Sequence, residues 1–191
     1  MKYVEFEPIK TSRLLLRQLR STDVDCYYKR LGSSEEVTRY MLWQPHKSPH
    51  ESRKSIEKIL SKYHEHTYYC WGIALLEDDS IIGRIDLLRF DKQSNSCSFA
   101  YMLGKEFWNC GFGTEALQAV FSFAFEKLQL QCIIADHMSV NIASGRVMQK
   151  ASMHYVRKHA SKYEKCGKYY DADEYIITCD DWEQTHKIYN N

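Results

Sequence analysis

A turn with two glycines joins a predicted strand to a predicted helix near the middle of the chain. The strand is "SFAYML" (residues 98–103), the glycines are Gly111 and Gly113, and apolar residues recur at helical spacing from Phe112 to Leu128. Glycine is unfavourable in helices and strands, so two of them here indicate a specially shaped backbone. Unpaired amides at a helix start, approached closely through glycines, form an anion site. The alternative is a tight turn in which the glycines only supply positive φ.

The remaining pattern predicts a mixed sheet with helices on both faces. The strand at 96–103, the helix that starts at Phe112 and the strand at 131–138 follow one another, and this strand–helix–strand step implies a crossover connection. The three strands before that helix form an antiparallel meander. The predicted strands cover residues 12–19, 68–77, 80–90, 96–103, 131–138, 154–161 and 174–182, and the predicted helices start at Ser21, Ser48, Phe112 and Asn141. The sequence therefore predicts an α/β or α+β fold.

Length and charge predict a single domain that spans residues 1–191. The chain carries 26 basic and 25 acidic residues, so no basic field favours a nucleic-acid partner. No apolar run has the length of a bilayer, and Glu5 and Glu7 interrupt the N-terminal segment where a signal peptide is apolar. We expect a cytoplasmic protein with neither a nucleic-acid nor a membrane partner.

The cysteines and histidines predict no metal site. Seven cysteines occur and none forms a CxxC pair, which is typical of reduced cytosolic thiols. The closely spaced histidines at 64 and 66 have no obvious third and fourth ligand in the sequence. We expect surface histidines and no bound metal.

Two common nucleotide-binding motifs fit the glycine turn poorly. A Walker loop ends in Gly-Lys-Ser/Thr, whereas Thr114 and Glu115 follow Gly113. A Rossmann fingerprint has a third glycine and stands early in a βαβ unit. The turn at 111–113 has neither property.

The segment "YMLGKEFWNCGFGTEAL" instead resembles the coenzyme A loop of the GNAT superfamily of N-acetyltransferases. The general pattern is Arg/Gln-x-x-Gly-x-Gly/Ala at a helix start, and Trp108 stands in the Arg/Gln position, as in the branch of ribosomal-protein N-terminal acetyltransferases. "IKTSRLLLRQLRSTD" (9–23) and "NIASGRVMQKASM" (141–153) resemble two further segments of that branch, in the same order. The resemblance covers roughly residues 9–182.

The resemblance implies a mixed, mostly antiparallel central sheet of about six to seven strands, with two strands splayed at the coenzyme site. The splayed pair should be "SFAYML" and "CIIADHM". It also implies acetyl-CoA as co-substrate. The residues implied to contact it are Tyr101, Met102, Leu103, Trp108, Asn109, Cys110, Gly111, Phe112, Gly113, Thr114, Asn141 and Ser144.

Four residues are candidates for the chemistry. By resemblance, the Ser144 hydroxyl protonates the departing thiolate, with Tyr101 or a water as the alternative donor. Asp86 and Asp136 lie in strands that otherwise read apolar, so each could take a proton from the amine or could simply pair with a neighbouring polar group. His137, Glu106 and a water chain remain further candidates for the base.

The acceptor side has one candidate segment, "RYMLWQPHKSP" (39–49). In the family this region lines the acceptor pocket, which implies substrate contacts for Tyr40, Trp43 and His46. Core packing of the aromatic side chains is the alternative.

The sequence departs from the branch pattern in three places. Ser152 and Met153 replace a usual Gly-Phe, Ser98 to Tyr101 replace a usual Glu-x-Gly-Tyr, and Met148 stands where many members carry a tyrosine acid. The missing tyrosine and glutamate remove two common catalytic groups.

The function implied is transfer of an acetyl group from acetyl-CoA to a primary amine, by direct attack in a ternary complex. The acceptor is a protein N-terminus or a small amine, and the enzyme is a monomer or a homodimer. Two alternatives remain: an antibiotic or polyamine acetyltransferase, and a non-catalytic acyl-CoA-binding regulatory module.

Overall fold

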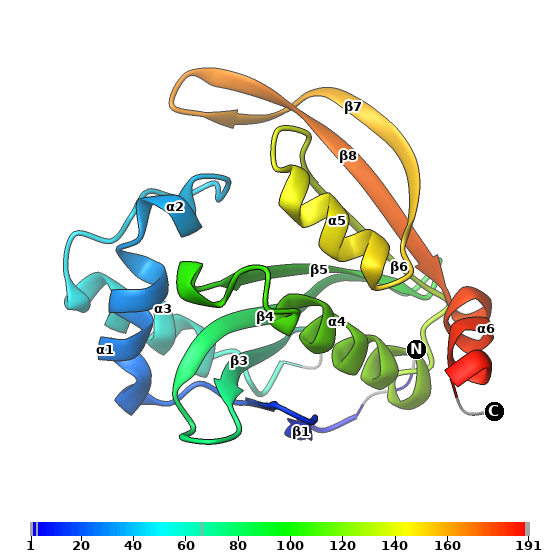
Figure 1. Cartoon of the computed structure of the whole chain (residues 1–191), viewed down its shortest axis with the longest axis horizontal. Helices are drawn as coiled ribbons and strands as arrows, with labels where there is room; N and C mark the ends of the chain where they lie inside the picture. The colour runs from blue at the N-terminus through cyan, green and yellow to red at the C-terminus, as the bar shows by residue number, and fades with distance from the viewer. Residues whose placement is uncertain (1, 3, 66, 190–191) are drawn as a thin grey trace.

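A computed structural model describes residues 2, 4–65 and 67–189. One sheet of eight strands, ordered β1-β2-β3-β4-β5-β6-β8-β7, runs through it (Figure 1). The strands are β1 (Ile9–Lys10), β2 (Leu14–Arg17), β3 (Tyr69–Leu75), β4 (Ile81–Asp91), β5 (Ser96–Leu103), β6 (Cys132–Met138), β7 (His154–Lys165) and β8 (Lys168–Thr178). Every neighbouring pair is antiparallel except β5 and β6.

The helices include one at each of the four places where the sequence predicts a helix, and two that it does not predict, at Glu35–Thr38 and Cys179–Tyr189. The helices are α1 (Val24–Tyr27), α2 (Glu35–Thr38), α3 (Pro49–Leu60), α4 (Phe112–Ser122), α5 (Ile142–Lys150) and α6 (Cys179–Tyr189). Short 3-10 turns cover Ser21–Asp23 and Lys105–Phe107, and π-helical turns follow α1 at Tyr28–Gly32 and α4 at Phe123–Lys127. His66, half of the closely spaced histidine pair, lies outside the described residues.

Helices cover both faces of the sheet. Alternate residues of a strand point to opposite faces, and in the central strands both sets are apolar. In β3, Tyr69, Trp71 and Ile73 pack in one core cluster with α4, while Cys70 and Ala74 pack in a second cluster with α1 and α3. This confirms the predicted mixed, mostly antiparallel sheet with helices on both faces.

Two details of the prediction were wrong. The sheet has eight strands rather than six to seven, because Ile9–Lys10 folds back antiparallel onto Leu15 and Leu16 of β2. The last strand ends at Thr178, and residues 179–182 start α6 instead of extending the strand. Thr178 and Asp181 cap this helix start together. The Asp181 carboxylate accepts hydrogen bonds from the backbone N–H and the hydroxyl of Thr178, and the Asp181 N–H donates to that hydroxyl at 3.1 Å.

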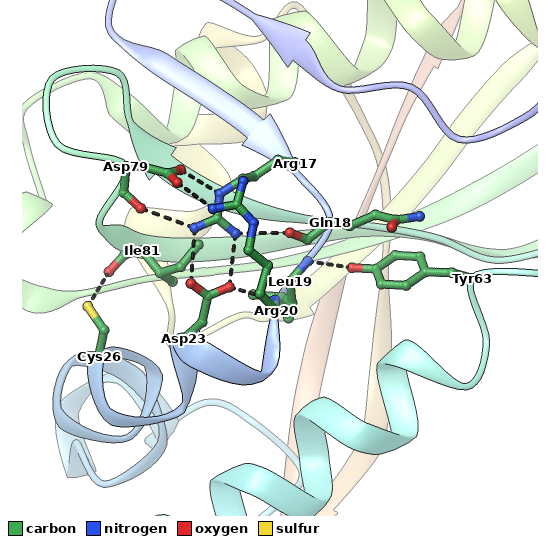
Figure 2. A network of polar contacts seen from close by, with 9 residues as sticks. All are labelled: Arg17, Gln18, Leu19, Arg20, Asp23, Cys26, Tyr63, Asp79 and Ile81. Atoms are coloured by element: carbon green, nitrogen blue, oxygen red, sulfur yellow. Dashed lines mark hydrogen bonds and ion pairs between the residues drawn. The ribbon is translucent and has the colours of Figure 1, made fainter.

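A buried ion pair ties the first strands to the first helix. Arg17 of β2 is 5% exposed and makes two hydrogen bonds to Asp23, at 2.9 and 3.0 Å. It makes two more to Asp79 in the β3–β4 turn, one to the carboxylate and one to the backbone carbonyl oxygen. Figure 2 shows that Asp23 also accepts from the backbone N–H of Arg20, while the Tyr63 hydroxyl accepts from the N–H of Leu19. Asp23 therefore does more than cap a helix, since its charge balances a buried guanidinium.

The β7–β8 hairpin reaches across to α2 (Figure 1). Lys165 at its tip donates to the carbonyl oxygens of Thr38 and Arg39, at 2.7 and 3.0 Å, and Gln44 donates to the sulfur of Cys166. These contacts fasten the hairpin to the segment after α2.

Candidate active site

The central feature of the site is the incomplete pairing of β5 with β6. The two strands are paired only at Ser96↔Cys132 and Cys97↔Ile133. Beyond these residues β5 remains paired with β4, and β6 with β8, so the edges that face each other have no partner strand. In Figure 1 the two strands start together near α6 and separate toward the other side of the molecule.

A cavity of about 220 Å³ lies at this opening. Both splayed strands, α5, β4, β7 and the segment after α2 contribute to its lining. The lining residues are Tyr40, Met41, Leu42, Leu88, Arg89, Ser98, Phe99, Ala100, Tyr101, Ala135, Asp136, His137, Met138, Asn141, Ser144, Met148 and Tyr163. Five of the predicted site residues therefore meet in one place: Tyr40, Tyr101, Asp136, Asn141 and Ser144.

Tyr101 and Ser144 form the polar pair on one side of the cavity. Ser144 is 9% exposed, in α5. Burial raises the pKa of the Tyr101 phenol, and a hydrogen bond with Ser144 acts in the opposite direction. Both hydroxyls are therefore protonated at neutral pH and can donate a proton to a strongly basic atom.

Asp136 forms a second polar cluster. It accepts hydrogen bonds from the Tyr163 hydroxyl and from the Lys162 ammonium group, the latter at 2.5 Å. Burial and the contact with Asp136 raise the pKa of Tyr163, so this phenol stays protonated. Asp136 is the one carboxylate among the lining residues, and it is already paired with a cation.

His137 lies deeper, between β6 and α5. Its Nδ1 atom lies 2.8 Å from the carbonyl oxygen of Met138, and its ring stacks on Tyr175. A Cβ atom on Gly145 would lie 2.7 Å from its Nε2 atom. The glycine within α5 is thus explained by close packing against His137.

The glycine loop begins α4 beside this cavity. Gly111 is the residue before the helix and has φ +82°, while Asn109 has φ 60°. Positive φ is unfavourable for side chains with a Cβ, so Gly111 is suited to the turn. A Cβ on Gly113 would make only ordinary contacts, the nearest at 3.5 Å from Val147.

The side chains of this loop hold its shape. The Trp108 indole N–H donates to the carbonyl oxygen of Leu103 at 2.7 Å, and the Phe112 ring lies edge-on to Phe107. Cys110 is exposed, and its thiol donates to the carbonyl oxygen of Trp108. Gly111, the residue before α4, has no side chain that could cap the first amides of the helix. Backbone amides at Gly111 to Thr114 therefore suit a phosphate group.

A clamp that sequence reasoning missed fixes α4 to the turn before β2. Glu115 accepts hydrogen bonds from the Thr11 hydroxyl at 2.6 Å, the Ser12 hydroxyl at 3.1 Å, and the backbone and guanidinium of Arg13 at 3.0 and 2.7 Å. Arg13 also donates to the carbonyl oxygen of Cys110 and lies 4.2 Å over the Phe112 ring. The clamp therefore joins residues about a hundred positions apart.

Besides the glycine loop, five predicted residues lie outside the cavity at the splayed strands. Asp86 is 2% exposed and accepts from Tyr68 at 2.7 Å and from Arg84 at 3.0 Å, so it does not line the cavity. Trp43 and His46 line a second cavity, on the α1 and α3 side of the sheet. Met102 and Leu103 close β5, and their side chains point into opposite core clusters.

Comparison with known proteins identifies the family. The profile of the acetyltransferase (GNAT) domain matches residues 13–154, well over half of the chain. The chain belongs to the GNAT acetyltransferase family. A Bacillus subtilis protein named as an uncharacterized N-acetyltransferase, YoaA, is 27% identical over 172 residues, which cover 90% of this chain and 97% of that protein.

Solved GNAT structures share the fold. The ribosomal L7/L12 α-N-protein acetyltransferase RimL, solved with coenzyme A, superposes with a TM-score of 0.79 at 17% identity, covering 90% of this chain and 98% of that one. Spermidine N-acetyltransferase from Vibrio cholerae, solved with CoA and spermine, gives 0.77 at 17% identity, with 91% and 99% covered. At this identity the likeness concerns the fold alone.

Membership of the GNAT family makes the chain an acetyltransferase, and acetyl-CoA is the family's co-substrate. In residues 2, 4–65 and 67–189, no helix is long and apolar enough to cross a membrane. No three metal-binding side chains gather among those same residues.

The sequence analysis also missed Lys162 and Tyr163, because only the folded β7–β8 hairpin brings these two residues to Asp136.

The Glu115 clamp gives a testable prediction. Burial acts to raise the pKa of Glu115, but hydrogen bonds from Thr11 and Arg13 outweigh it and leave the pKa below its ordinary 4.5. Glu115→Gln should lower the free energy of unfolding by about 1–2 kcal/mol near neutral pH, since it removes charged hydrogen bonds. Urea denaturation measures this loss.

The pH dependence follows from the depressed pKa. The charged carboxylate stabilises the fold above pH 4.5, and this stabilisation is lost as the pH falls through the folded-state pKa. The difference between wild type and Glu115→Gln should therefore shrink at acidic pH. Glu126→Gln, at an exposed position beyond α4, is the control and should change little. An equal loss in both variants would contradict the clamp.

Proposed function

We propose that this GNAT enzyme transfers the acetyl group of acetyl-CoA directly to a primary amine, on a protein N-terminus or a small molecule. The observation that carries the proposal is the opening between β5 and β6, which lies beside the uncapped start of α4 and gathers Tyr101, Asn141 and Ser144. A phosphate site and a slot between strands are what a long phosphorylated thioester requires.

The residues fit the coenzyme as the resemblance implies. Amides at the start of α4 would hold the diphosphate, and the free edge of β5 at Tyr101 to Leu103 would pair with the pantetheine arm. Asn141, at the start of α5, lines the cavity and would position that arm. When bound, the thioester supplies an activated acetyl group and a thiolate leaving group.

The cavity residues then have distinct tasks. The neutral amine attacks the carbonyl carbon, the carbon–sulfur bond breaks, and the Ser144 hydroxyl gives its proton to the departing thiolate, with Tyr101 as the alternative donor. Lys162 and Tyr163 already hold the two oxygens of Asp136, the one carboxylate in the lining, so in this proposal the amine proton passes to water and on to solvent. Asp86 takes no part in this scheme, because Tyr68 and Arg84 occupy its oxygens and it does not line the cavity.

Tyr40 is the acceptor-side residue that the proposal retains. It lines the cavity with Met41 and Leu42, beneath the hairpin that Lys165 fastens to Thr38 and Arg39. An amine that enters here meets the free edge of the sheet. Trp43 and His46 line the second cavity instead, on the α1 and α3 side of the sheet.

Charge argues against a polyamine as the acceptor. Asp136 is the sole acidic residue among the residues that line the cavity, and it is paired with Lys162, while Arg89 adds a positive charge. A polycation would find no free carboxylate there. The named N-acetyltransferases among the relatives, together with the convergent hydroxyls, favour an active enzyme over a non-catalytic module.

The glycine loop at the start of α4 gives a prediction about coenzyme binding. Gly111→Val should raise the dissociation constant of CoA at least tenfold, because a β-branched residue is strained at positive φ and crowds the proposed phosphate site. Gly167→Val is the matched control, since Gly167 has φ +72° at the hairpin turn with open space around it. Unchanged CoA affinity by calorimetry in folded Gly111→Val would refute the assignment.

The second prediction concerns the proton donor. Ser144→Ala should lower kcat by roughly 10- to 1000-fold, the range of general acid catalysis, with little change in CoA affinity. Steady-state kinetics with Tyr101→Phe alongside identifies the donor. Full activity in Ser144→Ala together with loss in Tyr101→Phe would transfer the role to Tyr101.

The third prediction concerns the order of events. Direct attack requires both substrates on the enzyme, so initial-rate plots should intersect, and Cys110→Ala should keep most of its kcat. Cys110 is exposed in the loop and does not line the cavity, which places its thiol poorly for an acetyl-enzyme. Parallel plots, or an acetylated Cys110 found by mass spectrometry without acceptor, would overturn direct transfer.

A further inference from the structure

A second cavity, of about 300 Å³, lies on the α1 and α3 side of the sheet. It does not share a lining residue with the cavity at the splayed strands. Its walls come from α1, α3, β4 and the segments before α3 and before β3. The lining residues are Tyr27, Trp43, His46, Ser55, Lys58, Ile59, Lys62, Tyr68 and Arg84.

We propose that this cavity binds a small organic anion that combines a carboxylate with a planar ring. The lining pairs three cationic side chains with three aromatic ones and His46, and it contains no acidic residue. Such a surface attracts a negative charge and offers flat apolar area to the rest of the ligand.

The deepest cation is held rigidly. Arg84 donates through Nε to Asp86 at 3.0 Å and through Nη1 to the Tyr27 hydroxyl at 3.0 Å. Asp86 also accepts from Tyr68, so two of the aromatic walls and the guanidinium form one network. The Asp86 charge balances Arg84, which leaves the net charge of the cavity to its lysines.

Lys58 and Lys62 supply that charge. Among the described residues, no carboxylate oxygen lies within 4 Å of either ammonium group, whereas other lysines, such as Lys105 and Lys162, have such partners. The Lys62 ammonium lies 5.3 Å from the centre of the Tyr68 ring. A carboxylate near the two lysines would gain the compensation that the protein itself does not provide.

The aromatic wall is preorganised as well. The Trp43 and His46 rings lie 4.9 Å apart, and the His46 ring contacts the hydroxyls of Ser52 and Ser55 at 2.7 and 3.4 Å. Burial lowers the pKa of His46, so its imidazole is neutral at pH 7 and forms part of the flat wall. A ring that stacks here pays little ordering cost.

The site is connected to the proposed acceptor entrance by the chain itself. Tyr40 to Leu42 line the first cavity, and Trp43 and His46 line the second. On β4, Arg84 and Leu88 lie four residues apart, roughly 13 Å at strand rise. The anion is therefore either a distal group of a long acceptor or a separate small molecule. In both cases the same lysines and aromatic side chains would bind it.

Calorimetry with three matched probes tests the proposal. Phenylacetate carries the ring and the carboxylate, acetate lacks the ring, and phenethylamine carries the opposite charge. We expect phenylacetate to bind at least tenfold more tightly than either other probe. The double variant Lys58→Ala, Lys62→Ala should weaken phenylacetate binding at least tenfold, whereas Lys54→Ala, on an exposed part of α3 outside the cavity, should leave it unchanged.

The outcomes separate this inference from the acetyltransferase proposal. CoA affinity, measured on the same variants, should not change, because the coenzyme site lies at α4. Phenethylamine binding as tightly as phenylacetate, or phenylacetate binding that survives the double variant, would overturn the anion site. Absence of phenylacetate binding to a wild type that still binds CoA would overturn it as well. Competition between phenylacetate and an acceptor identifies the distal-group source, and simultaneous binding identifies a separate ligand.

Discussion

The parallel contact between β5 and β6, only two residue pairs long, is the constraint on which the site depends. A crossover through α4 brings β6 beside β5, yet β8 holds the far edge of β6 and β4 holds the far edge of β5. The two strands therefore separate, and beyond Cys97 and Ile133 the backbone groups on their facing edges have no strand partner. Such groups require water or a ligand, so the gap in the sheet is also a binding slot.

The sequence predicts this arrangement where its signals are local. Period-two and period-3.6 patterns locate β3 to β6 and α3 to α5, and the loop around Gly111 identifies the turn whose backbone now shows positive φ. Three ordered motif resemblances give the family, which the domain match confirms. Asn141, Ser144, Tyr101 and Asp136 accordingly meet in one cavity.

Long-range contacts are what the sequence does not predict. Asp86 and Asp136 look alike as acidic residues in apolar strands, but β4 turns Asp86 toward Arg84 and Tyr68, while β6 turns Asp136 into the cavity. The Glu115 clamp, the Lys162–Asp136 pair and the hairpin contact to Thr38 join distant segments, and no local pattern indicates them. Aromatic residues of one short segment divide between two cavities for the same reason.

Hydrogen exchange with and without CoA tests the central claim most directly. If the slot and the start of α4 hold the coenzyme, saturating CoA should slow exchange of the amides in 98–103, 109–115 and 141–145. Amides of α3 and of the second cavity should not change. Exchange that stays unchanged in these three segments while CoA is bound, or protection confined to the α1 and α3 side, would contradict the account.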